Sequence, residues 1–189
     1  LTIPRRLRLE EVRGSWRLIQ EPIPELETLR GLRREVEGLI VADSTIDLTD
    51  RGLSGRALDL RVRIDPGRAA DVGLAVRTGN GEATRIGFRP DSLRIYVDRR
   101  RSGRTEFHER FSARHEAPLE LEDGALDLRV LVDASSVEVF AEGGRRVFTE
   151  RIFPSPSSRG VAVYARGGEA VVRRLSAWPM ESVWTSESE

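Results

Sequence analysis

Hydrophobic and polar residues alternate with a period of two along most of the chain. In the segment 57–65, Leu58, Leu60, Val62 and Ile64 are separated by charged residues. This period places the apolar side chains on one face of a β-strand, so the segment is predicted to be a half-buried strand. The same pattern recurs in the segments 72–77, 83–88, 93–98, 125–133, 137–141, 146–153, 161–165 and 170–178, and more weakly in 7–12, 16–20, 36–42 and 119–121.

Short turn sequences separate these segments. They are rich in glycine, proline, asparagine and aspartate, as in Asp65-Pro66-Gly67 and Gly79-Asn80-Gly81, and these residues favour tight turns. Many short strands with one polar face are typical of antiparallel sheets rather than of βαβ units. The predicted fold class is all-β: a sandwich of two antiparallel sheets, a jelly roll of the concanavalin or lectin kind, with about a dozen strands and little helix.

The length of 189 residues is sufficient for one hydrophobic core. We expect a single β-sandwich domain over residues 1–184, followed by a polar tail over residues 185–189. One segment departs from the strand pattern. In the segment 25–35, leucines recur three residues apart after Pro24, which predicts a helix of one or two turns.

Composition narrows the class of partner. The chain has 31 Lys+Arg and 31 Asp+Glu, so its formal net charge at pH 7 is +0. Binding to nucleic acid or to an anionic membrane requires a basic face, whereas acidic and basic residues are interleaved here, so neither partner is expected. No apolar run in the sequence has the length that a bilayer requires. Met180 is the only methionine and residue 1 is Leu1, which is not a native translation start, so we expect the chain to be a segment of a longer protein.

The sequence offers few motifs for metal, cofactor or nucleophilic chemistry. It has no cysteine, and its two histidines are His108 and His115. A metal site needs three or four convergent ligands, so satisfied or surface histidines are favoured, and neither a metal nor a cofactor is expected. There is no GxSxG nucleophile elbow, and the absence of lysine excludes a P-loop. Carboxylate pairs suffice for glycoside hydrolysis, but cross-strand ion pairs with arginine are the simpler interpretation of them.

Two clusters interrupt the regular alternation. In the first, a predicted strand ends at Asp98 and leads through Arg99 into an arginine-rich turn. In the second, Glu138 and Phe140 share one face of a predicted strand, because residues two apart lie on the same side. Carboxylates and guanidinium groups bind sugar hydroxyls, and an aromatic ring packs on the apolar face of a sugar. These four residues therefore form a candidate carbohydrate-binding site on an exposed sheet face.

The same residues have a purely structural interpretation. Asp98 or Glu138 would pair with Arg99 and thereby connect neighbouring strands. Phe140 would then join the hydrophobic core. The sequence pattern leaves both interpretations open.

Further motifs follow the two clusters in the segments 153–154, 164–168 and 175–178. In this order and spacing, they resemble the C-terminal β-sandwich domain of glycoside hydrolase family 32, the β-fructosidases that include levanases, inulinases and invertases. The segment 98–103 is similar to the family's DRxxSG turn, and 135–141 to its SSVEVF strand. The segment 1–5 resembles the strand that follows the catalytic propeller. Glu142-Gly143-Gly144 stands where the family usually has Asn or Asp.

The resemblance implies that catalysis belongs to a five-bladed propeller preceding residue 1. The family's catalytic motifs are N-D-P, R-D-P and E-C, and none of them occurs in this chain. No catalytic residue is therefore carried over, and this segment alone is not expected to be an enzyme. The parent chain is expected to be a glycoside hydrolase that acts on β-fructofuranosidic bonds.

The resemblance leaves more than one function for the segment itself. The first is a non-catalytic accessory domain that stabilises the propeller, with Trp16, Leu18 and the segment 22–32 at the seam. The second is a carbohydrate-binding module that recognises terminal fructose in fructans. The third is a structural piece that forms a homo-oligomer and binds no ligand. The sequence does not distinguish sucrose, inulin and levan as the substrate of the parent.

Overall fold

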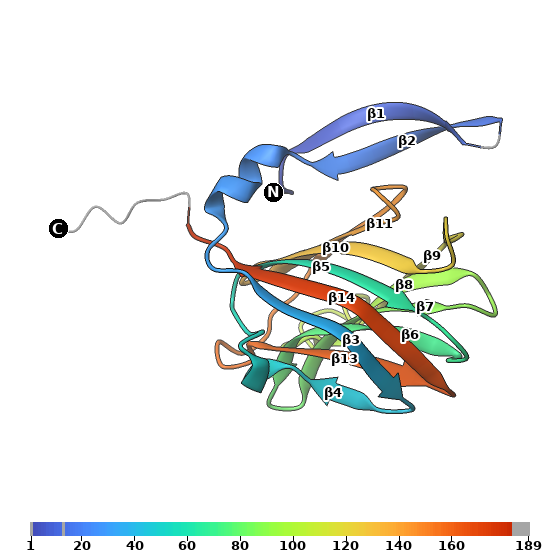
Figure 1. Ribbon diagram of the computed structural model, residues 1–189. Coiled ribbons are helices and arrows are strands. Elements are labelled where there is room, and N and C mark those ends of the chain that lie inside the picture. The colour runs from blue at the N-terminus through green and yellow to red at the C-terminus, as the bar shows by residue number, and fades with distance from the viewer. Residues whose placement is uncertain (1, 13, 183–189) are drawn as a thin grey trace.

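The computed structural model describes residues 2–12 and 14–182 (Figure 1). Trp184 and the predicted tail 185–189 lie outside the described residues. Within the described part, the chain forms fourteen strands and two short 3₁₀ helices. The strands are β1 Arg5–Val12, β2 Ser15–Pro22, β3 Arg34–Ala42, β4 Thr45–Asp47, β5 Leu58–Asp65, β6 Asp71–Gly79, β7 Glu82–Arg89, β8 Arg94–Arg101, β9 Arg114–Pro118, β10 Leu126–Val132, β11 Ser136–Ala141, β12 Arg146–Arg151, β13 Gly160–Arg166 and β14 Glu169–Pro179.

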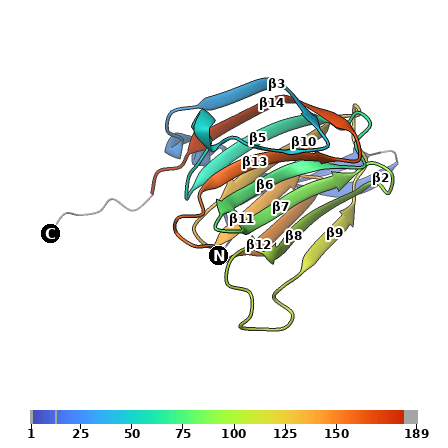
Figure 2. The same cartoon turned by 90° about the horizontal axis from the view of Figure 1, so that it is seen from below.

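Twelve of these strands form two six-stranded sheets, and the pairs within each sheet are antiparallel. Sheet I has the order β12-β11-β10-β5-β14-β3, and sheet II has the order β4-β13-β6-β7-β8-β9. The two sheets pack face to face, as the two layers in Figure 2 show. The predicted all-β sandwich is therefore confirmed. Strands β1 and β2 form a separate hairpin that lies over the outer face of sheet I (Figure 1).

The core lies between the two sheets and follows from the period-two pattern. Leu60 and Val62 of β5 are buried, and Ile86 and Phe88 of β7 approach them from sheet II as part of one apolar cluster. Each fully buried side chain of this size contributes about 1.5 to 3 kcal/mol of transfer free energy. The alternating charged residues then necessarily point to the outer faces.

The short helix predicted in the segment 25–35 is present, but it ends earlier in the segment than the leucine spacing indicates. Only Pro24–Leu29 is helical, as a 3₁₀ turn, and Arg34 already begins β3. The pairing of β3 with β14 satisfies backbone groups that a longer helix would have used, so tertiary pairing overrides the local leucine spacing. Within the described residues, no helix is long and apolar enough to cross a membrane.

One weak strand prediction is also wrong. The segment 119–121 is irregular, and the strand at this point is β9, Arg114–Pro118, which pairs with β8. Leu119 is buried and packs in the core, so its apolar character reflects packing rather than strand pairing. The short strand β4 was not predicted, because three residues are too few for a period to be visible.

Candidate functional site

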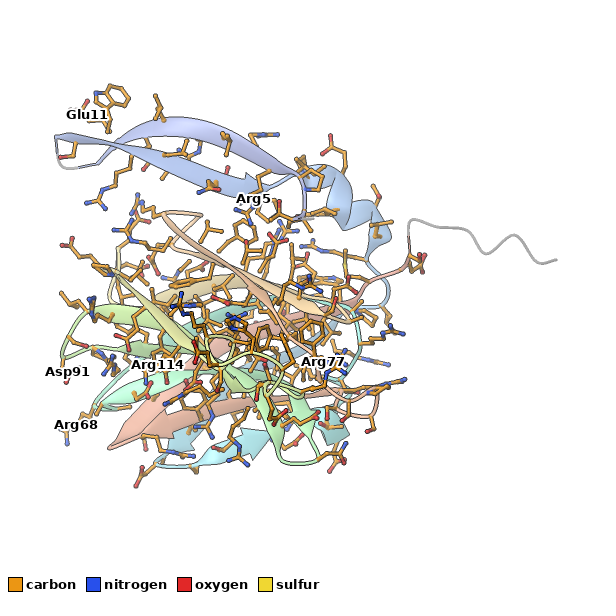
Figure 3. All side chains as sticks on the ribbon, turned by 180° about the vertical axis from the view of Figure 1, so that it is seen from behind. Arg5, Glu11, Arg68, Arg77, Asp91 and Arg114 are labelled. Atoms are coloured by element: carbon orange, nitrogen blue, oxygen red, sulfur yellow. The ribbon has the colours of Figure 1, made fainter. Side chains whose placement is uncertain are left out.

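The outer face of β11 carries two of the four candidate sugar-binding residues. Glu138 and Phe140 do share one face, and Val137 and Val139 point into the core as expected. However, Glu138 is only 3% exposed and Phe140 only 2%. The expectation of an exposed face is wrong, because Arg5 in the distant β1–β2 hairpin covers β11 with its side chain (Figure 3).

Arg5 is the residue that connects the hairpin to β11. Its Nη2 lies 2.5 Å from Oε2 of Glu138 and 2.6 Å from the hydroxyl of Thr149. Its guanidinium carbon lies 5.2 Å from the centre of the Phe140 ring. The backbone N–H of Ile3 donates to the other oxygen of Glu138 at 2.8 Å. Both oxygens of Glu138 are therefore occupied, and its contacts hold the hairpin on sheet I.

Asp98 lies on the opposite side of the molecule, on the outer face of sheet II. Its carboxylate accepts hydrogen bonds from the backbone N–H of Arg100 at 3.0 Å and from Nη2 of the same residue at 2.6 Å. Partial burial favours the protonated form of Asp98, but the bonds from Arg100 outweigh burial, so the pKa of Asp98 lies below its ordinary value. Asp98 and Glu138 thus belong to different sheets and do not share a site.

Arg99 lies at the edge where the two sheets approach each other. Its Nε is 3.3 Å from Oε2 of the buried Glu150, which belongs to β12 of sheet I. Its guanidinium carbon lies 4.2 Å from the centre of the Phe111 ring. The structural interpretation, in which Arg99 pairs with Asp98 or Glu138, is wrong in its partners. The pairs are Arg99 with Glu150, Asp98 with Arg100, and Glu138 with Arg5.

The two histidines have different hydrogen-bond partners. Nδ1 of His115 is 2.6 Å from Oε1 of Glu150, so His115 shares the carboxylate that pairs with Arg99. His108 is exposed and accepts a hydrogen bond from the backbone N–H of Arg110 at 3.1 Å. In the part of the chain that the structure describes, no group of three or more His, Asp or Glu residues could hold a metal ion.

The β1–β2 hairpin has one face on the sandwich and one face exposed. On the sandwich side, Ile19 is fully buried and Arg145 pairs with Glu10 at 2.9 Å. The other face carries four large apolar side chains that are 50–69% exposed, which we call the hairpin stripe: Leu7, Leu9, Trp16 and Leu18. Scattered apolar residues are ordinary on a protein surface, but a contiguous apolar patch marks an interaction site.

The central strands of sheet II carry a polar cluster that the sequence analysis did not identify. The Tyr96 hydroxyl lies 2.8 Å from the Tyr164 hydroxyl and 2.8 Å from Oδ2 of Asp71. The two rings lie over Gly87, where an added Cβ would be 2.3 Å from the Tyr164 hydroxyl oxygen. Burial raises the pKa of Tyr96 to about 12 and that of Tyr164 well above its usual value. Gly73 and Gly87 in otherwise regular strands were the available sequence signal.

Comparison with known proteins gives related chains of greater length. The chain is 37% identical to the levanase of Bacillus subtilis over 186 residues, which are 97% of this chain and 27% of that levanase. It is likewise 37% identical to the levanase of Bacillus sp. (strain L7) over 99% of this chain and 20% of that protein. The chain therefore spans about a quarter of the length of these levanases.

Solved structures share the fold of this chain. The exo-inulinase of Aspergillus awamori superposes with a TM-score of 0.84 at 24% identity, over 97% of this chain and 36% of that one. Fructan 1-exohydrolase IIa of Cichorium intybus gives a TM-score of 0.81 at 20% identity, over 96% of this chain and 41% of that one.

The sequence profile described as "Glycosyl hydrolases family 32 C terminal" matches residues 25–179. The match includes both six-stranded sheets, and it begins after the β1–β2 hairpin. The order of motifs in the sequence, the two-sheet sandwich and this match agree. The chain belongs to the C-terminal domain family of the family 32 glycosyl hydrolases.

Proposed function

We propose that this chain is the non-catalytic C-terminal β-sandwich of a longer glycoside hydrolase that acts on fructans or sucrose, and that it holds the catalytic domain through the hairpin stripe. The observation that carries the proposal is the stripe itself. Its four large apolar side chains are at least half exposed. An apolar surface of this kind gains free energy when a partner removes it from water.

The attachment of the hairpin supports its role as an adaptor between domains. The profile match begins at residue 25, so the hairpin is additional to the matched sandwich. It is nevertheless held firmly, by the Arg5–Glu138 pair, by the Glu10–Arg145 pair, and by the N–H of Gln20 on the carbonyl of Gly144 at 3.2 Å. A hairpin that is held on the sandwich and also exposes an apolar stripe can transmit the position of one domain to another.

The lengths of the relatives support a catalytic domain in the longer protein to which this chain would belong. The levanases of Bacillus subtilis and Bacillus sp. are about four and about five times as long, respectively, as the part that this chain matches. The names of these relatives point to fructans as the substrate of the parent, and sucrose-6-phosphate hydrolases among the relatives point to sucrose derivatives. In this proposal, the parent's catalytic residues lie outside residues 1–189.

The experiment is a pair of substitutions in the full parent chain. Leu9→Asp and Trp16→Ser would place polar groups in the stripe, and we expect lower thermal stability of the catalytic domain and loss of fructose release from levan, inulin or sucrose on mild heating. Leu93→Asp is the matched control, because Leu93 is 47% exposed in the turn between β7 and β8. Equal behaviour of the stripe variants and the control would refute the proposal.

Fructan binding is the second candidate function. Its support is Asp98, which lies in a surface pocket of about 540 Å³ together with Arg85 and Arg100. Calorimetric titration of residues 1–189 with levan, inulin and fructose tests it. A saturable heat that Asp98→Ala abolishes would establish a fructan-binding module. The corresponding Glu138→Ala measurement needs an unfolding curve beside it, because Glu138 holds the hairpin.

Self-association is the remaining candidate, and it would use the same hairpin stripe. Sedimentation of residues 1–189 distinguishes it from the accessory role. A dimer that Leu9→Asp dissociates would support a homo-oligomer. A monomer at all concentrations would leave the stripe available for a catalytic domain.

A further inference from the structure

The outer face of sheet II has a pocket of about 540 Å³ near the β6–β7 turn. We call it the basic pocket, because Arg85, Arg100 and Arg101 line it together with two acids, Glu82 and Asp98. It lies on the opposite side of the sandwich from the hairpin. Neither the accessory role nor the Tyr96–Tyr164 cluster accounts for it.

Two neighbouring irregularities shape this pocket. The register between β6 and β7 shifts between Val76 and Gly79, and the register between β7 and β8 shifts between Ala83 and Arg85. The first leaves Arg77 buried with a φ of 54°, a region that non-glycine residues seldom adopt. β-Bulges redirect side chains and are enriched next to functional sites. Here the second shift falls directly between the strands that present Arg85 and Arg101.

The acids of the basic pocket already accept hydrogen bonds from neighbouring residues. Asp98 accepts hydrogen bonds from three groups of Arg100, namely the backbone N–H, Nε and Nη2. Glu82 accepts the backbone N–H and the hydroxyl of Ser155, each at 2.8 Å, and the hydroxyl of Ser158 at 2.5 Å. Neither carboxylate therefore has an oxygen without a hydrogen-bond partner.

The donors of Arg85 and Arg101 have no such partners. Among the described residues, neither guanidinium group makes a hydrogen bond or an ion pair. The guanidinium carbon of Arg85 lies 5.8 Å from the centre of the Tyr164 ring. Each guanidinium group has five N–H donors and no acceptor. Among the described residues, the charged side chains of the pocket that lack a hydrogen-bond partner are therefore donors.

We infer that the basic pocket binds a small oxyanion, a phosphate or carboxylate group, through Arg85 and Arg101. A sugar hydroxyl both donates and accepts hydrogen bonds. In this pocket, the two carboxylates that could accept from it already accept hydrogen bonds from other residues of the chain. An oxyanion needs only donors and is also attracted by the positive charge. The inference does not depend on the accessory-domain proposal, because it concerns the opposite sheet.

The test is an NMR titration of residues 1–189 with inorganic phosphate, with citrate and with fructose, observing the arginine Nε–H signals. Arg85→Gln and Arg101→Gln assign the two signals and serve as the binding variants. Arg68→Gln is the matched control, since Arg68 is also exposed and its side chain forms no ion pair within residues 2–12 and 14–182. We expect saturable shifts of the Arg85 and Arg101 signals with phosphate or citrate, and at least tenfold weaker binding in either binding variant.

Titration with phosphate, with citrate and with fructose distinguishes anion binding from sugar binding. Saturation by phosphate alone or by citrate alone identifies the oxyanion and supports the inference. Linear, non-saturating shifts shared by the Arg68 signal would overturn it, because they indicate only screening of exposed charges. Saturation by fructose and not by the anions would also overturn it, in favour of sugar binding at Asp98. Thermal unfolding of each variant confirms that a loss of shifts is not a loss of fold.

Discussion

Two ion pairs with nearly equal lengths show how differently the two outer faces of the sandwich are used. Arg5 and Glu138 are 2.5 Å apart on sheet I, with side chains 16% and 4% exposed. Arg100 and Asp98 are 2.6 Å apart on sheet II, with side chains 57% and 14% exposed. The first pair is covered by the hairpin, whereas the second is open to solvent. Burial, and not distance, therefore decides the energetic role of each pair.

The same contrast extends over the two faces. On sheet I, the fully buried Asp59 accepts from Nη2 of Arg30 at 2.7 Å and from Nη2 of Arg129 at 2.8 Å. On sheet II, the buried groups are two tyrosines and their neighbours, and the arginines of the basic pocket remain in solvent. The outer face of sheet I therefore holds other segments of the chain, whereas the outer face of sheet II leaves arginine N–H donors open to solvent.

Breaking the covered pair gives the largest expected effect. Glu138→Ala leaves Arg5 without its carboxylate in a buried position, and removing one partner of a buried pair costs about 3 to 5 kcal/mol. Urea unfolding of residues 1–189 measures this loss. Glu138→Gln, which keeps the size and one acceptor oxygen, is expected to lose less. If Glu138→Ala lowered the free energy of unfolding by less than Arg100→Ala does, the contrast between the two faces would be contradicted.

Alkaline pH is expected to have the next largest effect, through sheet II. Burial raises the pKa of Tyr96 from an ordinary 10.0 to about 12, so the folded state favours the neutral phenol. The associated stability is fully present below pH 10 and is lost as the pH rises towards 12. A shift of about two units corresponds to about 2 to 3 kcal/mol.

Absorbance near the tyrosinate band measures this directly, because Tyr96 and Tyr164 are the only tyrosines of the chain. The folded protein should show no tyrosinate at pH 10.5, whereas the chain in urea should be more than half ionised. Half-ionisation near pH 10 in the folded protein would show that the pair is open to water. Tyr96→Phe provides the control, because it leaves one tyrosine to titrate.

Gly87→Ala is expected to have a smaller effect on sheet II. An added Cβ would lie 2.3 Å from the Tyr164 hydroxyl oxygen and 2.3 Å from Cζ of Tyr96, so both rings must move. Overpacking of this kind costs about 1 to 3 kcal/mol. Thermal unfolding measures the loss, and Gly31→Ala is the control, since its nearest neighbour would be 3.4 Å away. Equal stability of the two variants would mean that the Tyr96 and Tyr164 rings move aside without loss of stability.

Breaking the solvent-exposed Arg100–Asp98 pair is expected to have the smallest effect on stability. Arg100→Ala removes an exposed guanidinium group from Asp98, and exposed pairs contribute about 0 to 1 kcal/mol. Urea unfolding at low and high salt measures it, and the difference from the wild type should shrink as salt screens the charges. A loss as large as that of Glu138→Ala would show that solvent exposure does not weaken this pair.

The fold was predictable to a large extent because period-two alternation is a local property. The pattern in 57–65 became β5, and that in 137–141 became β11. The short helix in the segment 25–35 was predictable, but the start of β3 at Arg34 was not, because pairing with β14 determines where β3 begins. The short β4 has too few residues to show a period.

The candidate site was predictable only in part. The shared face of Glu138 and Phe140 follows from their spacing and is present. The cover over that face comes from Arg5, 133 residues away in the chain, so no local pattern reveals it. Asp98 and Arg99 are adjacent in sequence, yet one points to the outer face and the other joins the sheets at an edge. The register shift between β7 and β8 places an extra residue in β8 between Asp98 and Arg101, and this changes the phase of alternation in β8 in a way that sequence spacing does not show.

The central claim is that the hairpin stripe packs on a catalytic domain of the parent chain. Hydrogen–deuterium exchange, compared between the full parent and residues 1–189 alone, tests it most directly. The account predicts that peptides covering β1 and β2 exchange more slowly in the parent, while peptides covering β7 and β8 on sheet II exchange equally in both. Equal exchange of β1 and β2 in the two proteins would contradict it.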